Sequence, residues 1–594
     1  MNITMRSNKV DFERLLIILI VAVGVGVRII GLGRTPLSNY EAENALQALA
    51  IATGADPGTI SQPGYVFLTS PLFFVFEGDN FSARLIPALA GGALLLSVIG
   101  FRRLLGKATI LILVLGLAID PGMVAVSRLA DSSMIALASA ILCLTSFYHR
   151  QPVLAGIAGA LALMSGRGMF GGLVGLVLAI GIGSYLYKTG RIGAFWDDRS
   201  SFTDNTIWGA MSRSAGATLI LIGTLFFSTP NGVGSIFNGL SSYLVGWLKT
   251  AGVPAGRLIF ALLIYQPLPV MLALIAIVEG WRNRKPTLQW LSIWASSAML
   301  ATVIYPSRQV YDLIWAIVPI WVLAAVGLAR FLNLRGIELL PAGGQAVLIV
   351  LLASLSWINV AGLSLYPVDY QTYQLRWALI FGTFILGAVA TILVGFGWSF
   401  KTARHGLIWG LVCAFGLYTL SNLWGAARFR SFSENEFWHP GPVVQQSVDL
   451  VRTLSEISQW RTGIENSLDI TILSNEPSIK WSLREWPSAR FRSAVPSGEL
   501  PSAIITSADQ DPIKLATGYR GQDFSWEVSP DWNSNLPPNW LEWLVFRKTP
   551  QKVEKVILWV RSDLFPGGVI QSEAESTQQD EDILIPNPVI NRNN

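Results

Sequence analysis

The chain has 594 residues, of which 52% are hydrophobic and 14% are charged. Soluble domains usually carry about 25% charged residues, so this composition excludes an ordinary soluble protein and indicates a polytopic membrane protein. The net charge is +5, but the basic residues are spread over many loops, which argues against nucleic-acid binding. Cys143 and Cys413 lie in apolar runs and the three histidines are scattered, so neither a disulfide framework nor a Cys/His metal site is predicted.

Apolar runs long enough to cross a bilayer recur along the first two thirds of the chain, and we predict about 13 transmembrane helices. They cover residues 15–33, 84–101, 105–122, 131–148, 152–166, 169–187, 214–230, 257–280, 288–305, 311–329, 345–366, 376–399 and 405–425. No small-residue cleavage site follows the first run, which predicts an uncleaved anchor. The run 63–76 is too short to cross comfortably, so it predicts a helix lying in the membrane interface.

The positive-inside rule gives this arrangement an orientation, because short cytoplasmic loops are enriched in Lys and Arg. With the N-terminus inside, the inner segments hold 18 basic residues and the outer loops hold eight. The inner set is Arg6, Lys9, Arg14, Arg102, Arg103, Lys107, Arg150, Lys188, Arg191, Arg199, Arg213, Arg282, Arg284, Lys285, Arg330, Arg335, Lys401 and Arg404. The outer set is Arg34, Arg84, Arg128, Arg167, Lys249, Arg257, Arg308 and Arg376. An odd number of spans then places the C-terminus outside the cytoplasm.

From Phe432 onward the long apolar runs stop, and a polar stretch of domain size begins. Apolar residues from Val443 to Ile457 recur at helical spacing, and short strands are predicted at 469–473, 503–506, 541–546 and 556–560. We therefore predict a transmembrane domain over 1–431, an extracytoplasmic α/β domain over 432–565 and a disordered tail over 566–594.

The outer basic residues need an explanation, because the positive-inside rule predicts their depletion. Arg34, Arg84, Arg128, Arg167 and Arg308 stand one per loop at the ends of predicted spans. One interpretation is that each arginine extends separately from a helix end toward water. We favour the other interpretation, in which several guanidinium groups converge on one outer cavity, because this planar cation suits phosphate oxygens.

The first outer loop contains an amphipathic helix that begins near Glu41. Ser38 stands three residues before Glu41, a spacing typical of a capping box, in which the carboxylate has a purely local role. The functional alternative is a carboxylate at the boundary of lipid and water that takes a proton from an acceptor hydroxyl or holds a cation.

Two further constellations lie at predicted outer helix ends. Arg128 and Asp131 are three residues apart and can share one helical face, although a local ion pair and helix cap would explain them equally. Arg308, Tyr311 and Asp312 cluster before an apolar span, where aromatic residues are also common as interfacial anchors.

Together these residues resemble the GT-C superfamily of membrane glycosyltransferases, in particular the branch with protein O-mannosyltransferases and the lipid A aminoarabinose transferase. The resemblance covers about residues 15–330, and its motifs are loose although their order and spacing agree. The matching segments are Tyr40-Glu41-Ala42, Gln62-Pro63-Gly64-Tyr65, Phe81-Ser82-Ala83-Arg84-Leu85-Ile86-Pro87, Arg128 with Asp131, Ser165-Gly166-Arg167-Gly168, and the loop from Ser307 to Pro319. The family's span count and external C-terminus also fit the predicted layout.

Two positions depart from the family pattern. The first acid of the family's pair, which usually serves as the base, is Tyr40 here, and a basic residue often found before the proline is Gln62. Either Glu41 or the shifted Glu43 takes over as base, or the site has kept ligand binding and lost catalysis.

The resemblance implies transfer of a sugar from a polyprenyl-phosphate carrier to a hydroxyl of a lipid, glycan or protein, on the extracytoplasmic side and with inversion at the anomeric carbon. Glu41 is then the expected base, and Arg84, Arg128 and Arg308, with Arg167, the expected partners of the leaving phosphate. Asp131 either orients an arginine or joins a divalent cation, so the metal requirement stays open. Glu43 and Tyr311 complete the expected substrate-binding set.

Two other functions stay open at this point. A transporter or flippase of an anionic lipid-linked substrate would use the same outer arginines without bond chemistry, although such proteins often show internal repeats and acids deep in their spans. A noncatalytic membrane scaffold is favoured if Glu41 is only a cap.

Overall fold

A computed structural model describes residues 3–194, 204–249, 252–365, 369–427, 429, 433–496, 498–509 and 517–565. Contacts divide the chain into two units that alternate along the sequence. The first unit comprises residues 1–35, 44–440 and 530–550, and the second comprises 36–43, 441–529 and 551 onward. The predicted domain division thus stays a prediction, and both the predicted tail 566–594 and Arg199 lie outside the described residues.

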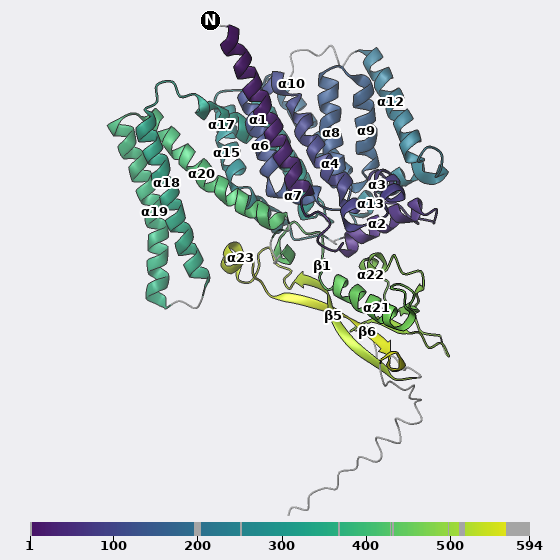
Figure 1. Cartoon of the computed structure of the whole chain (residues 1–594). Coiled ribbons are helices and arrows are strands. Elements are labelled where there is room, and N and C mark those ends of the chain that lie inside the picture. Colours follow the sequence, from purple (N-terminus) through teal and green to yellow (C-terminus); the bar gives the residue numbers. More distant parts are fainter. Residues whose placement is uncertain are drawn as a thin grey trace, which may run out of the picture. The chain divides into compact units, whose positions relative to one another are not determined.

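Helices form most of the first unit (Figure 1). They are α1 (Ile3–Ile29), α2 (Asn39–Ala52, whose first residues belong to the second unit), α3 (Pro63–Phe76), α4 (Asn80–Ile99), α5 (Arg102–Leu105), α6 (Lys107–Ile119), α7 (Pro121–Ser127), α8 (Ser133–Tyr148), α9 (Pro152–Met164), α10 (Arg167–Lys188), α12 (Asn205–Gly223), α13 (Ser235–Val245), α14 (Ala255–Tyr265), α15 (Pro267–Arg282), α16 (Pro286–Ile304), α17 (Ile314–Ala329), α18 (Leu339–Ser364), α19 (Tyr370–Gly397), α20 (Phe400–Ala426) and α23 (Trp540–Phe546). Short 3₁₀ turns add η1 (Pro230–Gly234), η2 (Val310–Leu313), η3 (Arg330–Leu332) and η4 (Ser433–Asn435).

Among the described residues, seven helices are long and apolar enough to cross a membrane, and nine if each of two bent pairs forms one span. The chain is therefore an integral membrane protein that crosses the bilayer several times. Helices overlap all of the predicted spans, but the number of about 13 crossings stays a prediction. The short apolar run 63–76 is a helix, α3, as expected.

Two predicted spans are each divided between two helices, and a proline is the physical reason in both. The predicted span 257–280 is two helices, α14 and α15, which meet at 94° around Gln266. The predicted span 105–122 ends at Ile119, and α7 follows at 58°. Pro267 and Pro121 each begin the second helix, and a residue before proline is driven out of the helical conformation. Asp120 then caps α7 by accepting a hydrogen bond from the Met123 N–H at 2.9 Å.

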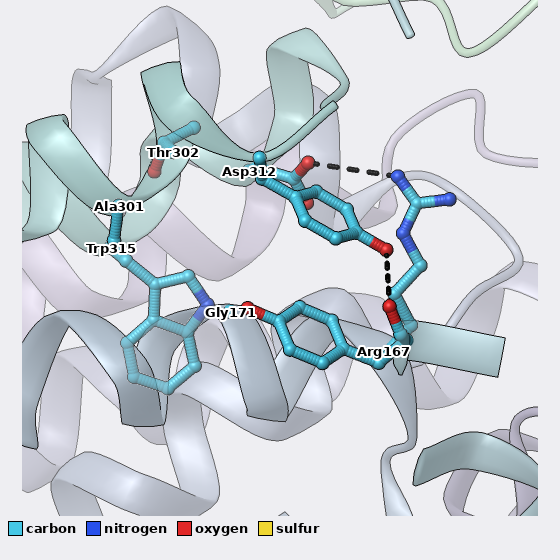
Figure 2. A pocket seen from close by; sticks show the side chains of 8 residues that line it. Arg167, Gly171, Ala301, Thr302, Asp312 and Trp315 are labelled. Atoms are coloured by element: carbon cyan, nitrogen blue, oxygen red, sulfur yellow. Dashed lines mark hydrogen bonds and ion pairs between the residues drawn. The ribbon is translucent and has the colours of Figure 1, made fainter. Parts of the chain in front are cut away.

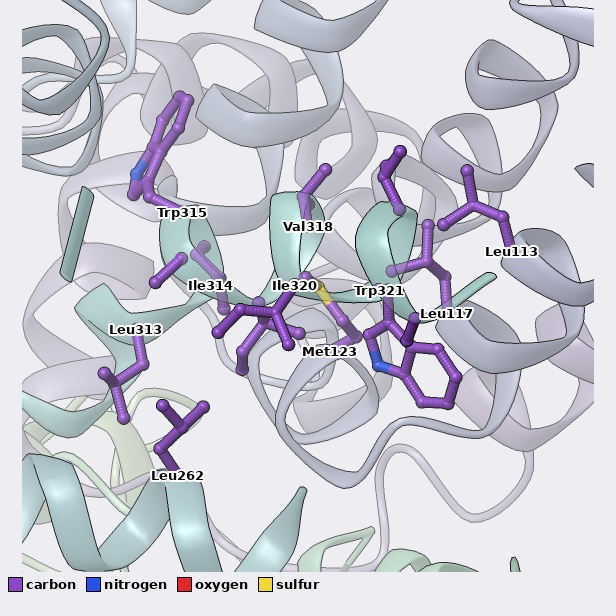
Figure 3. Close-up of a cluster of buried hydrophobic side chains, with 14 of the residues drawn as sticks. Leu113, Leu117, Met123, Leu262, Leu313, Ile314, Trp315, Val318, Ile320 and Trp321 are labelled. Carbon is purple, nitrogen blue, oxygen red and sulfur yellow. The ribbon is translucent and has the colours of Figure 1, made fainter. Parts of the chain in front are cut away.

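The centre of the first unit is α17, which contributes side chains to the core on all sides (Figure 3). In the span formed by η2, α17 and η3, 78% of the most apolar window is buried, against 28% in α18 and α19. Trp321 lies beside Leu117 and Met123 of the neighbouring elements, and Ile314 and Val318 belong to the same apolar core. In contrast, α18, α19 and α20 lie side by side as a group with mainly exposed apolar surfaces, as lipid-facing helices have (Figure 1).

The second unit contains a six-stranded mixed sheet with the strand order β1-β5-β6-β4-β2-β3. The strands are β1 (Val443–Val444), β2 (Ile470–Ile472), β3 (Ala489–Phe491), β4 (Ala503–Ser507), β5 (Tyr519–Pro530) and β6 (Gln551–Arg561), with helices α21 (Ser447–Thr462) and α22 (Pro477–Ser482) and the turn η5 (Ser562–Leu564). β2 runs parallel to β3 and β4, whereas β4 and β6 are antiparallel. The sheet, α21 and α22 share one apolar core, so the predicted α/β module is confirmed.

Two local predictions in the C-terminal part of the chain are wrong. The expected strand 541–546 is the helix α23, in which Trp543 is fully buried while Trp540 and Phe546 are 43% and 37% exposed. One buried residue per turn is a helical pattern, and short apolar runs do not distinguish it from a strand. The predicted helical stretch from Val443 begins only at Ser447, because Val443 and Val444 pair with β5 as β1.

Candidate functional site

Glu41 stands in the first turn of α2 and is fully buried. Its Oε2 accepts hydrogen bonds from the backbone N–H and the hydroxyl of Ser38 at 3.2 and 3.1 Å, while the Glu41 N–H donates to Ser38 Oγ at 3.3 Å. This is the reciprocal capping box that the sequence spacing indicates. The capping role is therefore present, and the catalytic role of Glu41 stays a prediction. Glu43, two residues further along, is exposed.

The loop before Glu41 is fixed by Asn39 within the second unit. The Asn39 side chain donates through Nδ2 to Glu527 Oε1 on β5 and accepts from the Ser478 N–H at 2.9 Å. Burial, followed by the negative charges of Glu476 and Glu554, raises the pKa of Glu527 to about 7. The position of the first outer loop thus depends on a carboxyl group that titrates near neutral pH.

Arg84 and Arg128 are both buried at the C-terminal end of α1. Arg84 Nη1 donates to the backbone oxygens of Leu32 and Thr35 at 3.2 and 2.7 Å. Arg128 donates to four further backbone oxygens, those of residues 27, 28, 30 and 31, at 2.9 to 3.3 Å. The last carbonyls of a helix have no partner within it, and Arg128 supplies donors to those of α1, while Arg84 donates to the segment that follows α1. These contacts give both arginines a structural role.

Asp131 is fully buried and organises the start of α8. Its carboxylate accepts from the Ser133 N–H at 3.0 Å and from the Ser133 hydroxyl at 2.8 Å. The next residue, Ser132, donates to Gln62 Oε1 from both its N–H and its hydroxyl, at 2.8 and 2.9 Å. Gln62, the position that departs from the family pattern, therefore joins two of the predicted outer loops.

A third predicted outer loop reaches the same place through Gly166. Its φ of +64° suits glycine, and a Cβ there would stand 2.4 Å from the Ser61 carbonyl oxygen. The Ser132 hydroxyl also lies 2.6 Å from the Ser165 carbonyl oxygen, so its single hydrogen is shared between this acceptor and Gln62 Oε1. Segments 61–62, 131–133 and 165–167, far apart in the sequence, thus meet, and Arg167 follows directly as the first residue of α10.

Arg167 and Asp312 face each other across a small pocket (Figure 2). Arg167 Nη2 lies 3.9 Å from Asp312 Oδ2, and its guanidinium lies 5.3 Å from the ring centre of Tyr305. The rings of Tyr243 and Tyr305 are stacked with 4.8 Å between their centres. The Tyr305 hydroxyl donates to the Tyr243 carbonyl at 3.0 Å. The pocket is lined by Arg167, Gly171, Tyr243, Ala301, Thr302, Tyr305, Asp312 and Trp315.

This pocket holds a cation, a carboxylate and aromatic faces, but little free space. Its volume is about 10 Å³, which is room for a single water molecule. The ion pair is loose, and Arg167 also donates to the Ser307 carbonyl. A phosphate group needs the side chains of Arg167 and Asp312 to separate, after which the guanidinium offers its donors to the new anion.

The predicted site residues Arg308 and Tyr311 lie close to this pocket in sequence but do not line it. Arg308 Nη1 donates to the Tyr305 carbonyl at 3.0 Å, and its buried Nε has no hydrogen-bond partner among the described residues. Tyr311 is part of the apolar core. Tyr243 was not predicted, because α13 is too short to register as a span and its aromatic residues carry no motif. Among the described residues, no group of three or more His, Cys, Asp or Glu side chains is placed to hold a metal ion.

No family model and no curated protein sequence matches the chain. Two crystal structures of ArnT from Cupriavidus metallidurans are similar to it, one bound to undecaprenyl phosphate and one in the apo state. Each covers 79% of this chain and 84% of ArnT, with 13% and 14% identity and TM-scores of 0.49 and 0.47. The oligosaccharyltransferase of Archaeoglobus fulgidus, crystallised with Zn and sulfate, has 13% identity over 80% of this chain and 62% of its own, with a TM-score of 0.38. ArnT is a lipid A aminoarabinose transferase of the GT-C superfamily, the family that the motifs resemble. At these identities and TM-scores the structural similarity does not assign a function to this chain.

Proposed function

We propose that the chain is a membrane glycosyltransferase that moves a sugar from a polyprenyl-phosphate-linked donor to a hydroxyl acceptor at the extracytoplasmic face. The observation that supports this most is the convergence of three predicted outer loops on Arg167, whose guanidinium stands beside stacked tyrosines at a pocket. A guanidinium recognises phosphate oxygens, and flat aromatic faces suit the C–H faces of a sugar ring. The motifs that resemble the GT-C superfamily lie in these same loops.

In this proposal Arg167 holds the leaving phosphate, with Arg308 as the second cation. Arg308 is chosen because its Nη1 donates to the carbonyl of Tyr305, a residue of the pocket lining, whereas Arg128 donates to carbonyls at the end of α1 and Arg84 to carbonyls of the segment that follows α1. Positive charge at the leaving oxygen stabilises the transition state, in which the phosphate gains an electron pair. Asp131 has a positioning role, since it orders the loop that precedes α8.

Glu41 is the proposed base. The acceptor oxygen attacks the anomeric carbon from the face opposite the phosphate, the bond to the phosphate oxygen breaks, and Glu41 takes the acceptor proton. A direct displacement of this kind inverts the anomeric carbon. The reaction as written balances in atoms and electrons.

The test is the Glu41→Gln variant of the full chain. Glutamine keeps an oxygen that accepts the Ser38 hydrogen bonds and removes the basic oxygen, so the helix cap survives. We expect sugar transfer from radiolabelled polyprenyl-phosphate sugars to fall by about 10²- to 10⁴-fold, the usual contribution of a general base. Asp56→Asn is the matched control, because Asp56 is an exposed acid of the same loop region. Unchanged transfer by the Glu41 variant contradicts the proposal.

The same preparations separate the two rival functions. A flippase would move labelled lipid across vesicles without changing its sugar, and a scaffold would do neither. Mass spectrometry of lipid that copurifies with the protein is expected to find a polyprenyl phosphate or its sugar derivative.

A further inference from the structure

A second, larger pocket lies in the first unit where the end of α15, the turn η3 and the start of α20 come together. Its volume is about 800 Å³, within the range of ligand-binding pockets. It is lined by Ile275, Val278, Glu279, Arg282, Asn283, Arg330, Phe331, Phe400, Lys401, Arg404 and His405. None of these residues belongs to the proposed transferase site, and all its basic residues fall in the predicted cytoplasmic segments.

The polar part of the lining is strongly basic. Four basic side chains, Arg282, Arg330, Lys401 and Arg404, stand against one acid, Glu279, which leaves a charge of +3 with His405 neutral. Glu279 is itself already engaged, because it pairs with Arg330 and also with Lys285 outside the lining, whose Nζ lies 3.0 Å from Oε1. Cations gathered without a matching number of acids favour an anionic ligand.

The apolar part of the lining has the character of a lipid-facing surface. Ile275, Val278 and Phe400 are 36%, 67% and 63% exposed. Phe400 lies on α20, which is long and apolar enough to cross the bilayer, and Ile275 and Val278 lie on α15, which meets this criterion together with α14. The Arg404 guanidinium lies 4.9 Å from the ring centre of Phe331, where charge and apolar surface adjoin. An acyl chain that covers these apolar side chains is stabilised by the hydrophobic effect, whereas a small soluble anion gains nothing from contact with them.

His405 adds a polar atom to which no described residue makes a hydrogen bond. The residue is 6% exposed, and its Nδ1 lies 2.8 Å from the Lys401 carbonyl oxygen. Its Nε2 is buried and has no hydrogen-bond partner among the described residues. Because Nδ1 donates to that carbonyl, Nε2 of the neutral ring is an acceptor, so it suits a hydroxyl group of a bound head group rather than its phosphate.

We propose that this pocket binds an anionic phospholipid, with the phosphodiester against Lys401, Arg404 and Arg282 and the acyl chains along Ile275, Val278 and Phe400. The recognised chemistry is a phosphate group, which a soluble phosphate ester also offers. The exposed apolar wall favours the lipid, and basic pockets between membrane helices are typical binding sites of anionic head groups. The lipid stabilises the junction of α15, η3 and α20 rather than taking part in transfer.

Native mass spectrometry of the full chain, exchanged into detergent with phosphatidylglycerol or phosphatidylcholine, tests this proposal. We expect retained phosphatidylglycerol, little phosphatidylcholine, and about tenfold weaker phosphatidylglycerol binding in the double variant Lys401→Gln and Arg404→Gln. Arg284→Gln is the matched control, since Arg284 is exposed, basic and close in sequence to Arg282 but outside the pocket lining. Its binding is expected to equal that of the natural chain.

Three outcomes overturn the proposal. Equal retention of the two lipids, or an equal loss in the Arg284 control, shows that the interaction is unspecific. Competition of phosphatidylglycerol by inorganic phosphate or glycerol 3-phosphate at similar concentration shows that the ligand is a soluble phosphate. The melting temperature in phosphatidylcholine alone checks that the double variant folds, and transfer activity is not the readout, so failure here leaves the proposed function untouched.

Discussion

Arg128 shows that a buried arginine in a membrane protein can donate its hydrogen bonds to backbone carbonyls rather than to a ligand. Its guanidinium donates to four carbonyl oxygens at the end of α1 and lies 5.2 Å from the ring centre of Phe429. The sequence places this residue among phosphate-binding candidates, because a residue type reveals chemistry but not the partner that uses it.

The structural role of Arg128 predicts a loss of stability in Arg128→Gln. Hydrogen bonds from a charged donor contribute about 1.5–3 kcal/mol, and several are lost together, so we expect unfolding to become easier by at least about 2 kcal/mol. Thermal unfolding of the purified variant measures this. A normal melting temperature combined with a raised KM for the donor would contradict this prediction and indicate that Arg128 binds the ligand.

Arg167 is expected to behave in the opposite way. Its guanidinium is only part-buried and its ion pair with Asp312 is loose, so Arg167→Gln is expected to fold normally. The loss of a charge-assisted bond to phosphate predicts a rise in the donor KM of about 10- to 100-fold. Steady-state kinetics with varied donor checks this, and a drop in melting temperature without a kinetic change speaks against it.

At the scale of elements, proline decides where apolar runs stop being single helices. Pro121 and Pro267 each follow a polar residue, Asp120 and Gln266, and each starts a new helix at an angle to the last. An apolar window averages over such breaks, which is why the sequence predicts single spans there. The helix α7 that follows the break ends at Ser127, directly before Arg128.

Strand β5 carries a pH-dependent contact with the first outer loop. The ordinary pKa of Glu527 is 4.5, and burial with the charges of Glu476 and Glu554 raises it to about 7 in the folded protein. The folded state therefore keeps a proton that the unfolded chain has lost, so stability falls as pH rises from about 4.5 to about 7. We expect Glu527→Gln to have a flatter pH dependence of melting temperature than the natural chain.

Glu465→Gln is the control for this measurement, because Glu465 is an exposed acid of the same unit. Its pH dependence is expected to match that of the natural chain. If the Glu527 variant keeps the natural slope between pH 4.5 and 7, this carboxyl group is not the one that titrates.

At the scale of the whole molecule, contacts join segments that the sequence keeps far apart. Residues 36–43 belong to the sheet-containing unit, and residues 530–550 belong to the helical unit. The domain boundary predicted near residue 432 depends on a change in composition along the sequence. The two units of the structure are instead defined by contacts between segments that are distant in the sequence. The orientation in the membrane is set by charge and is open to direct measurement.

We predict that Gln522 and Arg284 lie on opposite sides of the membrane. In a background with Cys143→Ser and Cys413→Ser, a membrane-impermeant maleimide should label Gln522→Cys in intact cells. It should label Arg284→Cys only after the membrane is permeabilised. Both positions are exposed, so labelling reports sidedness rather than burial. Labelling of both in intact cells would overturn the orientation derived from the positive-inside rule.

The sequence by itself determined the membrane class of this chain, the position of most helices, three of the strands and the capping box at Glu41. These features depend on local composition, periodicity and spacing, which a single stretch of chain contains. Only the tertiary structure decided which charged side chains meet. In the folded chain Arg128 donates to carbonyls at the end of α1, and Arg84 to the segment that follows it. Arg167 lies beside Asp312 and Tyr243, and Lys401, Arg404 and Arg282 line one pocket. The physical reason is that the partner of a charged side chain depends on how helices distant in the sequence pack together. A local sequence pattern contains no information about that packing.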